Sequence, residues 1–307
     1  MEPHRRTLIG TMLVLLLAAT ACGRIRPGNT GTIEHPEGSE DVILRVEDGG
    51  FFGPLAWTFG ALPSFSLYGD GRVIVPAPRI EIYPPPALQG LTVREVSEEG
   101  IQAILAEARD AGLLDGDRRY EGEGLDLDAT TTRFTVNADG GRHVVSVYAL
   151  GDDPEEAPSG ERDVRRALMD FTSRLSSLEE WLPAGSVGPE ELFAPDRLAV
   201  FTNPYDSEQG EFLPPLNEDE PDPPPEALPE LDWPLEQPIT GFGEPVEQYQ
   251  GPPILLVRCG VVEGRDLEAI LSTAEEASEL TPWVSGGERY ALVLRPLLPG
   301  EQACPES

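Results

Sequence analysis

The three cysteines, Cys22, Cys259 and Cys304, are the residues whose chemistry this sequence specifies best. A thiol can be acylated, form a disulfide, ligate a metal or act as a nucleophile, depending on its neighbours and its compartment. An odd cysteine in an exported protein needs a separate explanation, because disulfides use cysteines in pairs. The compartment therefore decides how the three are interpreted.

The N-terminus indicates that compartment. A positively charged start precedes an apolar run, Leu8 to Ala18, which is short for a membrane span. The run ends in L-A-A-T-A-C, which resembles the lipobox of bacterial lipoproteins, whose cysteine is lipidated and becomes the first mature residue. We therefore predict a signal peptide over residues 1–21 and lipidation of Cys22. Ala19 stands where the lipobox usually has leucine, and Ala19 with Ala21 also fits an ordinary signal peptidase, which would leave the product freely secreted.

Lipidation of Cys22 leaves Cys259 and Cys304 as an even pair. In an oxidising compartment we expect these two thiols to form a disulfide. Closing a loop of this length stabilises a fold by roughly 4 kcal/mol in the chain-entropy treatment. A structural role for this pair is favoured over a catalytic one.

Other catalytic or metal-binding constellations do not stand out. His143 is the one histidine in the part predicted to fold, and no nucleophile motif accompanies it. Clustered ligands at metal spacing and phosphate-cradling loops are also missing from the sequence. We therefore predict no catalytic residues, no metal and no cofactor. A hydrolase that uses paired carboxylates stays open, because any pair is hidden among 55 acidic residues.

The charge balance excludes one class of partner. The chain carries 55 acidic residues against 22 basic ones, all arginine, and its formal net charge is −33. Such a surface repels nucleic acid, which is bound through basic side chains. The acidity fits either ordinary solubility or life at high salt, where ions screen self-repulsion.

The clearest folded unit is a helix followed by a β-hairpin, from Val96 to Tyr148. Ser97 is a suitable N-cap and Gly112 a suitable stop. Between them, one apolar stripe has helical spacing. Its members are Ile101, Ile104, Leu105 and Ala108. Alternating residues on both sides of the turn 137–141 predict the hairpin.

Further elements extend this unit in both directions. The patterns predict a strand at 42–46, a hairpin at 64–76, a helix at 161–182, strands at 197–202, 254–259 and 289–295, and a helix at 267–277 capped by Asp266. Residues 101–111 and 267–277 are similar in sequence, which fits either two related units or two ordinary amphipathic helices.

The domain organisation follows from these patterns. We expect a flexible tether at 22–40, an α+β domain at 41–183, and a second α+β unit at 184–304 that an acidic Pro-rich loop interrupts at about 203–253. The fold class is α+β, with antiparallel sheets built from hairpins and amphipathic helices packed on one face.

A family resemblance adds to the interpretation. The runs at 68–74, 97–114, 128–132 and 144–148, with the tail 295–299 and Cys304, look like exported bacterial lipoproteins of unknown function. The resemblance covers roughly residues 60–150 and the C-terminal tail. It implies export and anchoring through Cys22 to the outer face of the bacterial cell membrane, and it implies no activity. We therefore expect a non-catalytic binding or envelope-associated module, with an unknown protein or envelope partner; the alternative is the envelope hydrolase.

Overall fold

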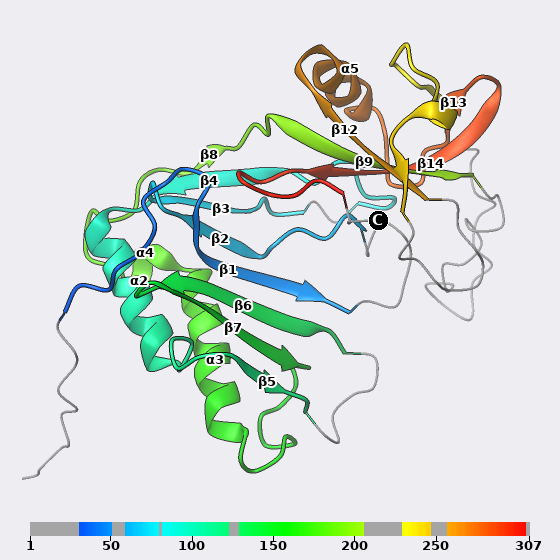
Figure 1. The fold of residues 1–307 in the computed structure, drawn as a ribbon. Coiled ribbons are helices and arrows are strands. Elements are labelled where there is room, and N and C mark those ends of the chain that lie inside the picture. Colours follow the sequence, from blue (N-terminus) through cyan, green and yellow to red (C-terminus); the bar gives the residue numbers. More distant parts are fainter. Residues whose placement is uncertain are drawn as a thin grey trace, which may run out of the picture. The chain divides into compact units, whose positions relative to one another are not determined.

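The computed structural model describes residues 31–50, 59–79, 82–122, 129–205, 229–246 and 257–304. The chain divides into two compact units, Met1–Thr32 and Ile33–Ser307, and the second holds the whole described fold. Its strands and helices confirm the α+β class with mainly antiparallel sheets (Figure 1). The predicted signal peptide, Cys22 and most of the acidic loop lie outside the described residues.

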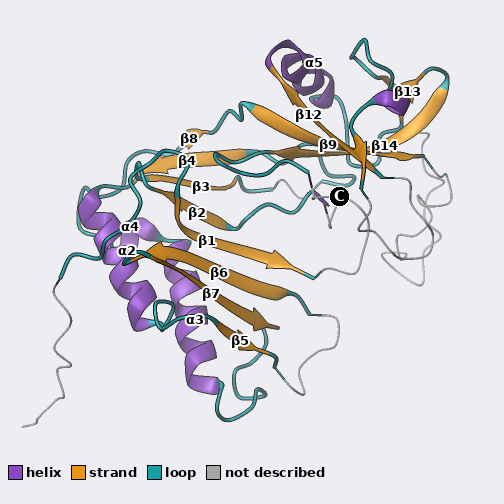
Figure 2. Ribbon diagram, in the orientation of Figure 1, coloured by secondary structure: helices purple, strands orange, loops and turns teal. Residues whose placement is uncertain are grey.

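The first sheet has eight strands. In sheet order they are β5 (Arg118–Tyr120), β7 (Gly141–Tyr148), β6 (Thr131–Ala138), β1 (Val42–Gly49), β2 (Phe65–Tyr68), β3 (Arg72–Pro76), β4 (Leu91–Glu95) and β8 (Glu191–Leu192). Helices α2 (Glu98–Asp110), α3 (Arg162–Leu175) and α4 (Leu178–Trp181) lie on one face of this sheet (Figure 2). The pair β5–β7 is parallel and the other described pairs of this sheet are antiparallel.

Helix α2 forms as its sequence predicts. The Ser97 side chain accepts a hydrogen bond from the Gly100 amide, which caps the first turn. All four residues of the apolar stripe are buried against the sheet. Gly112 has φ +83°, the left-handed conformation that ends many helices. The hairpin β6–β7 then turns at Asp139 and Gly140, both with positive φ.

The helix predicted at 161–182 is interrupted. Helix α3 ends at Leu175, and α4 begins only at Leu178. The hydroxyls of Ser176 and Ser177 both donate to the Ser173 carbonyl, at 2.7 and 3.4 Å, and so compete with the backbone bonds that would continue the helix.

The second sheet has six described strands. In sheet order they are β10 (Leu231–Asp232), β13 (Trp283–Ser285), β14 (Glu288–Pro296), β9 (Arg197–Pro204), β12 (Arg258–Glu263) and β11 (Glu244–Pro245). Helix α5 (Gly264–Ala274) packs on one face through Leu267 and Ile270. It starts three residues before the predicted helix, so Asp266 lies in the first turn and is not the cap. A short 3-10 turn (Ile239–Gly241) contributes Ile239 to the same core.

The strand pairing bears on the similarity between residues 101–111 and 267–277. After α2, the first hairpin strand, β6, pairs with β1 in the middle of its sheet. After α5, it is the second hairpin strand, β14, that pairs with β9. The two helix–hairpin units therefore differ in strand order. The predicted boundary near residue 184 falls between the sheets, although β8 beyond it still pairs with β4.

The C-terminal tail, Leu297–Cys304, contacts both sheets. Leu297 packs with Phe201 of the second sheet, while Leu298 packs with Tyr68 and Ile74 on the face of the first sheet opposite its helices. Gly300 has φ +67°, and an added Cβ would come within 2.5 Å of the Glu40 carbonyl. Only glycine fits this turn, which joins the end of the chain to the beginning of the fold.

Candidate functional site

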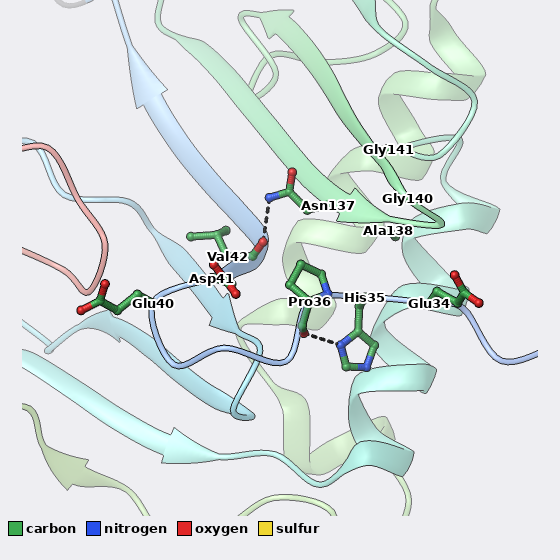
Figure 3. Close-up of a pocket in the computed structure, with 10 residues that line it drawn as sticks. All are labelled: Glu34, His35, Pro36, Glu40, Asp41, Val42, Asn137, Ala138, Gly140 and Gly141. Carbon is green, nitrogen blue, oxygen red and sulfur yellow. Dashed lines mark hydrogen bonds between the residues drawn. The ribbon is translucent and has the colours of Figure 1, made fainter.

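A hollow of about 570 Å³ lies between residues 34–42 and the β6–β7 turn. We call it the N-terminal hollow. The residues lining it are Glu34, His35, Pro36, Glu40, Asp41, Val42, Asn137, Ala138, Gly140 and Gly141 (Figure 3). It is open to solvent, and we take it as the candidate binding site.

Hydrogen bonds fix the two walls of the hollow to each other. The Asn137 side-chain amide donates to the Val42 carbonyl at 2.7 Å. The Asp139 amide donates to the Glu34 carbonyl at 2.7 Å, and the Asp139 carboxylate accepts from the Glu34 amide at 3.2 Å. The turn therefore holds the N-terminal segment in place across about a hundred residues of sequence.

Helix α2 supports the same segment from the other side. Ile33 is 2% exposed, and its amide and carbonyl both bond to the Gln102 side chain, at 2.8 and 2.9 Å. The His35 side chain is 7% exposed and lies between the Pro36 carbonyl, 2.8 Å from Nδ1, and the Glu98 carboxylate, 3.2 Å from Nε2. The fold thus begins at Ile33, within the segment for which the sequence predicts a tether.

Carboxylates dominate the charge of the hollow. Glu34, Glu40 and Asp41 are exposed, and none forms an ion pair with an arginine in the part of the chain that the structure describes. Figure 3 shows Glu34 and Glu40 far apart, with their carboxylates pointing away from each other, and Asp41 beside Val42, where β1 begins. This spacing suits several cationic groups on one partner better than a single ion. Within the described ranges, no group of three ligand-type side chains could hold a metal.

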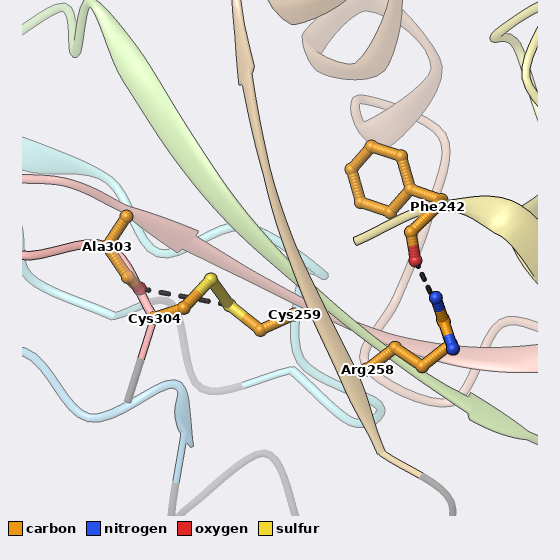
Figure 4. The surroundings of a disulfide bond; sticks show 5 residues. All are labelled: Phe242, Arg258, Cys259, Ala303 and Cys304. Carbon is orange, nitrogen blue, oxygen red and sulfur yellow. Dashed lines mark hydrogen bonds between the residues drawn. A yellow bond between two sulfur atoms is a disulfide. The ribbon is translucent and has the colours of Figure 1, made fainter. Parts of the chain in front are cut away.

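The predicted disulfide is present. Cys259 on β12 and Cys304 in the C-terminal tail are joined, with their Cα atoms 5.8 Å apart (Figure 4). Cys259 is buried with Leu297 and Val257 against the second sheet. The bond therefore fixes the end of the tail to the sheet and creates no exposed reactive thiol. Cys22, the predicted lipidation site, is not among the described residues.

The alternative of a carboxylate hydrolase requires two carboxyl groups that face a common cleft and differ in pKa. Among the described residues, no aspartate or glutamate belongs to the fully buried set. Burial raises the pKa of the Glu279 carboxyl because it disfavours the charged form, an effect that Arg79 partly offsets. No second carboxyl contributes to the shift. His143 on β7 is half-buried and has no serine or carboxylate hydrogen-bonded to it in the described part.

Glu279 gives a pH-dependent prediction. Folding raises the pKa of Glu279, so at a pH above the raised value the folded state contains a partly buried charge that lowers the free energy of unfolding. Below the ordinary pKa of 4.5 the carboxyl is protonated in both states, and this destabilisation is absent. Glu279→Gln should therefore raise Tm at pH 7, by no more than a few degrees for a domain of this size. Thermal melts at pH 7 and pH 4 test this, because the difference between variant and wild type should shrink at pH 4. A difference independent of pH would contradict the assignment.

Comparison with known proteins adds no assignment: no protein-family model, curated protein or solved structure matches this chain. None of the helices in the described ranges is long and apolar enough to span a membrane.

Proposed function

We propose that this chain is an exported protein, lipid-anchored through Cys22 to the outer face of the bacterial cell membrane, and that it is a non-catalytic binding module for a basic partner. The leader-like N-terminal sequence, the lipobox-like sequence and the odd number of cysteines support the location. A Cys259–Cys304 disulfide is in keeping with an oxidising compartment.

The observation that carries the binding role is the N-terminal hollow, with Glu34, Glu40 and Asp41 distributed along it. An extended segment bearing several arginine or lysine side chains would meet one carboxylate after another. Each exposed pair contributes about 0.2–1 kcal/mol, so three pairs together change affinity by roughly threefold to a hundredfold, with tenfold in the middle of that range. Such binding weakens as salt rises, because the charges are exposed to solvent.

A binding test must distinguish attraction by the carboxylates of the hollow from attraction by the overall negative charge of the chain, which is −33. The probe is a synthetic tetra-arginine peptide, titrated by calorimetry at low and at near-physiological salt. The hollow variant is Glu34→Gln/Glu40→Gln/Asp41→Asn. Its matched control is Glu268→Gln/Glu275→Gln/Glu276→Gln, which removes equal charge from exposed positions on and just after α5.

We expect the hollow variant to bind the peptide about tenfold more weakly than wild type, and the α5 control to change affinity by less than about twofold. Equal weakening in both variants would show that only the overall field attracts the peptide. That outcome would refute the hollow as the binding site.

A further inference from the structure

A second polar cluster lies between the two sheets and consists of other residues than those lining the N-terminal hollow. Arg45 of β1, Arg295 of β14 and Glu301 of the C-terminal tail meet there, with side chains only 16%, 13% and 13% exposed. Glu301 Oε1 is 2.7 Å from Arg295 Nη2 and 3.9 Å from Arg45 Nη1. Its Oε2 accepts from the Leu298 amide at 3.0 Å. One carboxylate therefore serves two arginines.

The donors of Arg45 are incompletely used. Its Nη2 donates to the Tyr68 hydroxyl at 3.0 Å, but its buried Nε has no hydrogen-bond partner among the described residues. Ser66 is the direct cross-strand neighbour of Arg45, and its fully buried hydroxyl also lacks a partner in that part of the chain. The unpartnered Arg45 Nε and Ser66 hydroxyl therefore belong to directly opposite residues on adjacent strands, β1 and β2.

Such a cluster is unusual on energetic grounds. A buried guanidinium offers five donors, and leaving them without acceptors destabilises the folded state, which apolar packing does not offset. Buried polar groups without protein partners are commonly satisfied by water or an ion. Two arginines facing one carboxylate also leave a net positive charge, in a chain that is otherwise strongly acidic. The charge of the cluster therefore favours binding of a further negatively charged group.

The anion already present belongs to the chain itself. Glu301 reaches the arginines because the tail is held by Leu297 and Leu298 on the two sheets and by the Cys259–Cys304 bond. An internal ligand of this kind has a high effective concentration and excludes weak competitors. The pKa of Tyr68 is raised, chiefly by burial, so its hydroxyl stays a neutral hydrogen-bonding group at this site.

We propose that Arg45, Arg295 and Ser66 form an oxyanion-binding site, which Glu301 fills in cis and which accepts a carboxylate or phosphate group when that side chain is withdrawn. The site is independent of the proposed basic partner of the N-terminal hollow. It would take an acidic peptide terminus or side chain, or a phosphate-bearing ligand, that displaces the tail.

The test uses the full chain with Glu301→Gln and, as a matched control, Glu288→Gln, which removes an exposed carboxylate from the same strand as Arg295. Thermal melts are recorded with sodium phosphate, sodium acetate or sodium chloride at constant ionic strength. We expect phosphate to raise the Tm of Glu301→Gln by at least about 3 °C, the effect of ligand at roughly ten times its dissociation constant. Wild type and Glu288→Gln should respond like the chloride samples.

Acetate distinguishes the ligand class: a response to acetate indicates a carboxylate site, and a response to phosphate alone indicates a phosphate site. Glu301→Gln/Arg45→Met should lose either response. If Glu301→Gln does not fold, Glu301→Asp, whose shorter side chain withdraws the carboxylate from the arginines, is measured in its place with the same expectation. No anion-specific response in the folded variant would overturn the proposal and leave the cluster as an internal ion network.

Discussion

Cys22→Ala should move the mature protein from the membrane fraction to the soluble extracytoplasmic fraction. We propose that the acyl chains on Cys22 anchor the wild-type protein, and burying each of their methylenes contributes about 0.8 kcal/mol to membrane affinity. Without the thiol the lipid has no attachment point, so the effect should be nearly complete. Fractionation followed by immunoblotting measures it.

The control for this experiment is Cys304→Ala, which also removes a thiol but leaves the lipidation site intact. It should remain with the membranes. A Cys22→Ala protein that also stays there, or a wild-type protein that takes up no labelled fatty acid, would contradict anchoring. The freely secreted form would then be the correct interpretation of the leader.

Removing the disulfide should have the largest effect on stability. Cys259→Ala/Cys304→Ala opens a bond between cysteines 45 residues apart, worth roughly 4 kcal/mol in the chain-entropy treatment. For a domain of this size, that corresponds to a fall in Tm of roughly 10 °C. The tail should also exchange its amide hydrogens faster, because packing of Leu297 and Leu298 and the Glu301 contacts alone would hold it.

Thermal melts and hydrogen exchange of the double variant, beside wild type under oxidising and reducing conditions, test this. Reduced wild type should behave like the variant. A Tm within about 2 °C of oxidised wild type would show that the bond adds little stability. Two free thiols in the exported protein would refute the disulfide and return these cysteines to a redox role.

Local sequence signals were sufficient for several elements. The stripe on α2 has the spacing of one helix face, and its ends carry a serine cap and a glycine stop, so periodicity and capping agree. The hairpin β6–β7 combines alternating residues with a turn that tolerates positive φ. The cysteine pair followed from counting, because only two cysteines remained once Cys22 was assigned.

Long-range contacts could not be found in this way. Arg165 looks like a polar interruption of the α3 pattern, yet it is 2% exposed and donates to the carbonyls of Tyr148 and Ala149 at the end of β7. These two carbonyls lie beyond the helix, and nothing near Arg165 in sequence marks them, whereas its ion pair with Glu161, four residues earlier, is local. Arg45 and Glu301 are also far apart in the chain and meet only because the tail passes between the sheets.

The N-terminal hollow was missed for the same reason. Residues 34–42 have the composition of a linker, rich in acids and poor in apolar residues. The segment is ordered by Gln102 and Asp139, two polar side chains whose partners are backbone groups. The one local signal was Ile33, an isolated apolar residue in a polar stretch, and it is the residue that is buried.

The most direct test of lipid anchoring and of the disulfide is the intact mass of the mature protein extracted from membranes, measured without reduction. We predict a chain that begins at Cys22, carries covalent lipid, and lacks the two thiol hydrogens of Cys259 and Cys304. A mass that includes residues 1–21, a mature chain without lipid, or a mass that retains both thiol hydrogens would contradict this prediction.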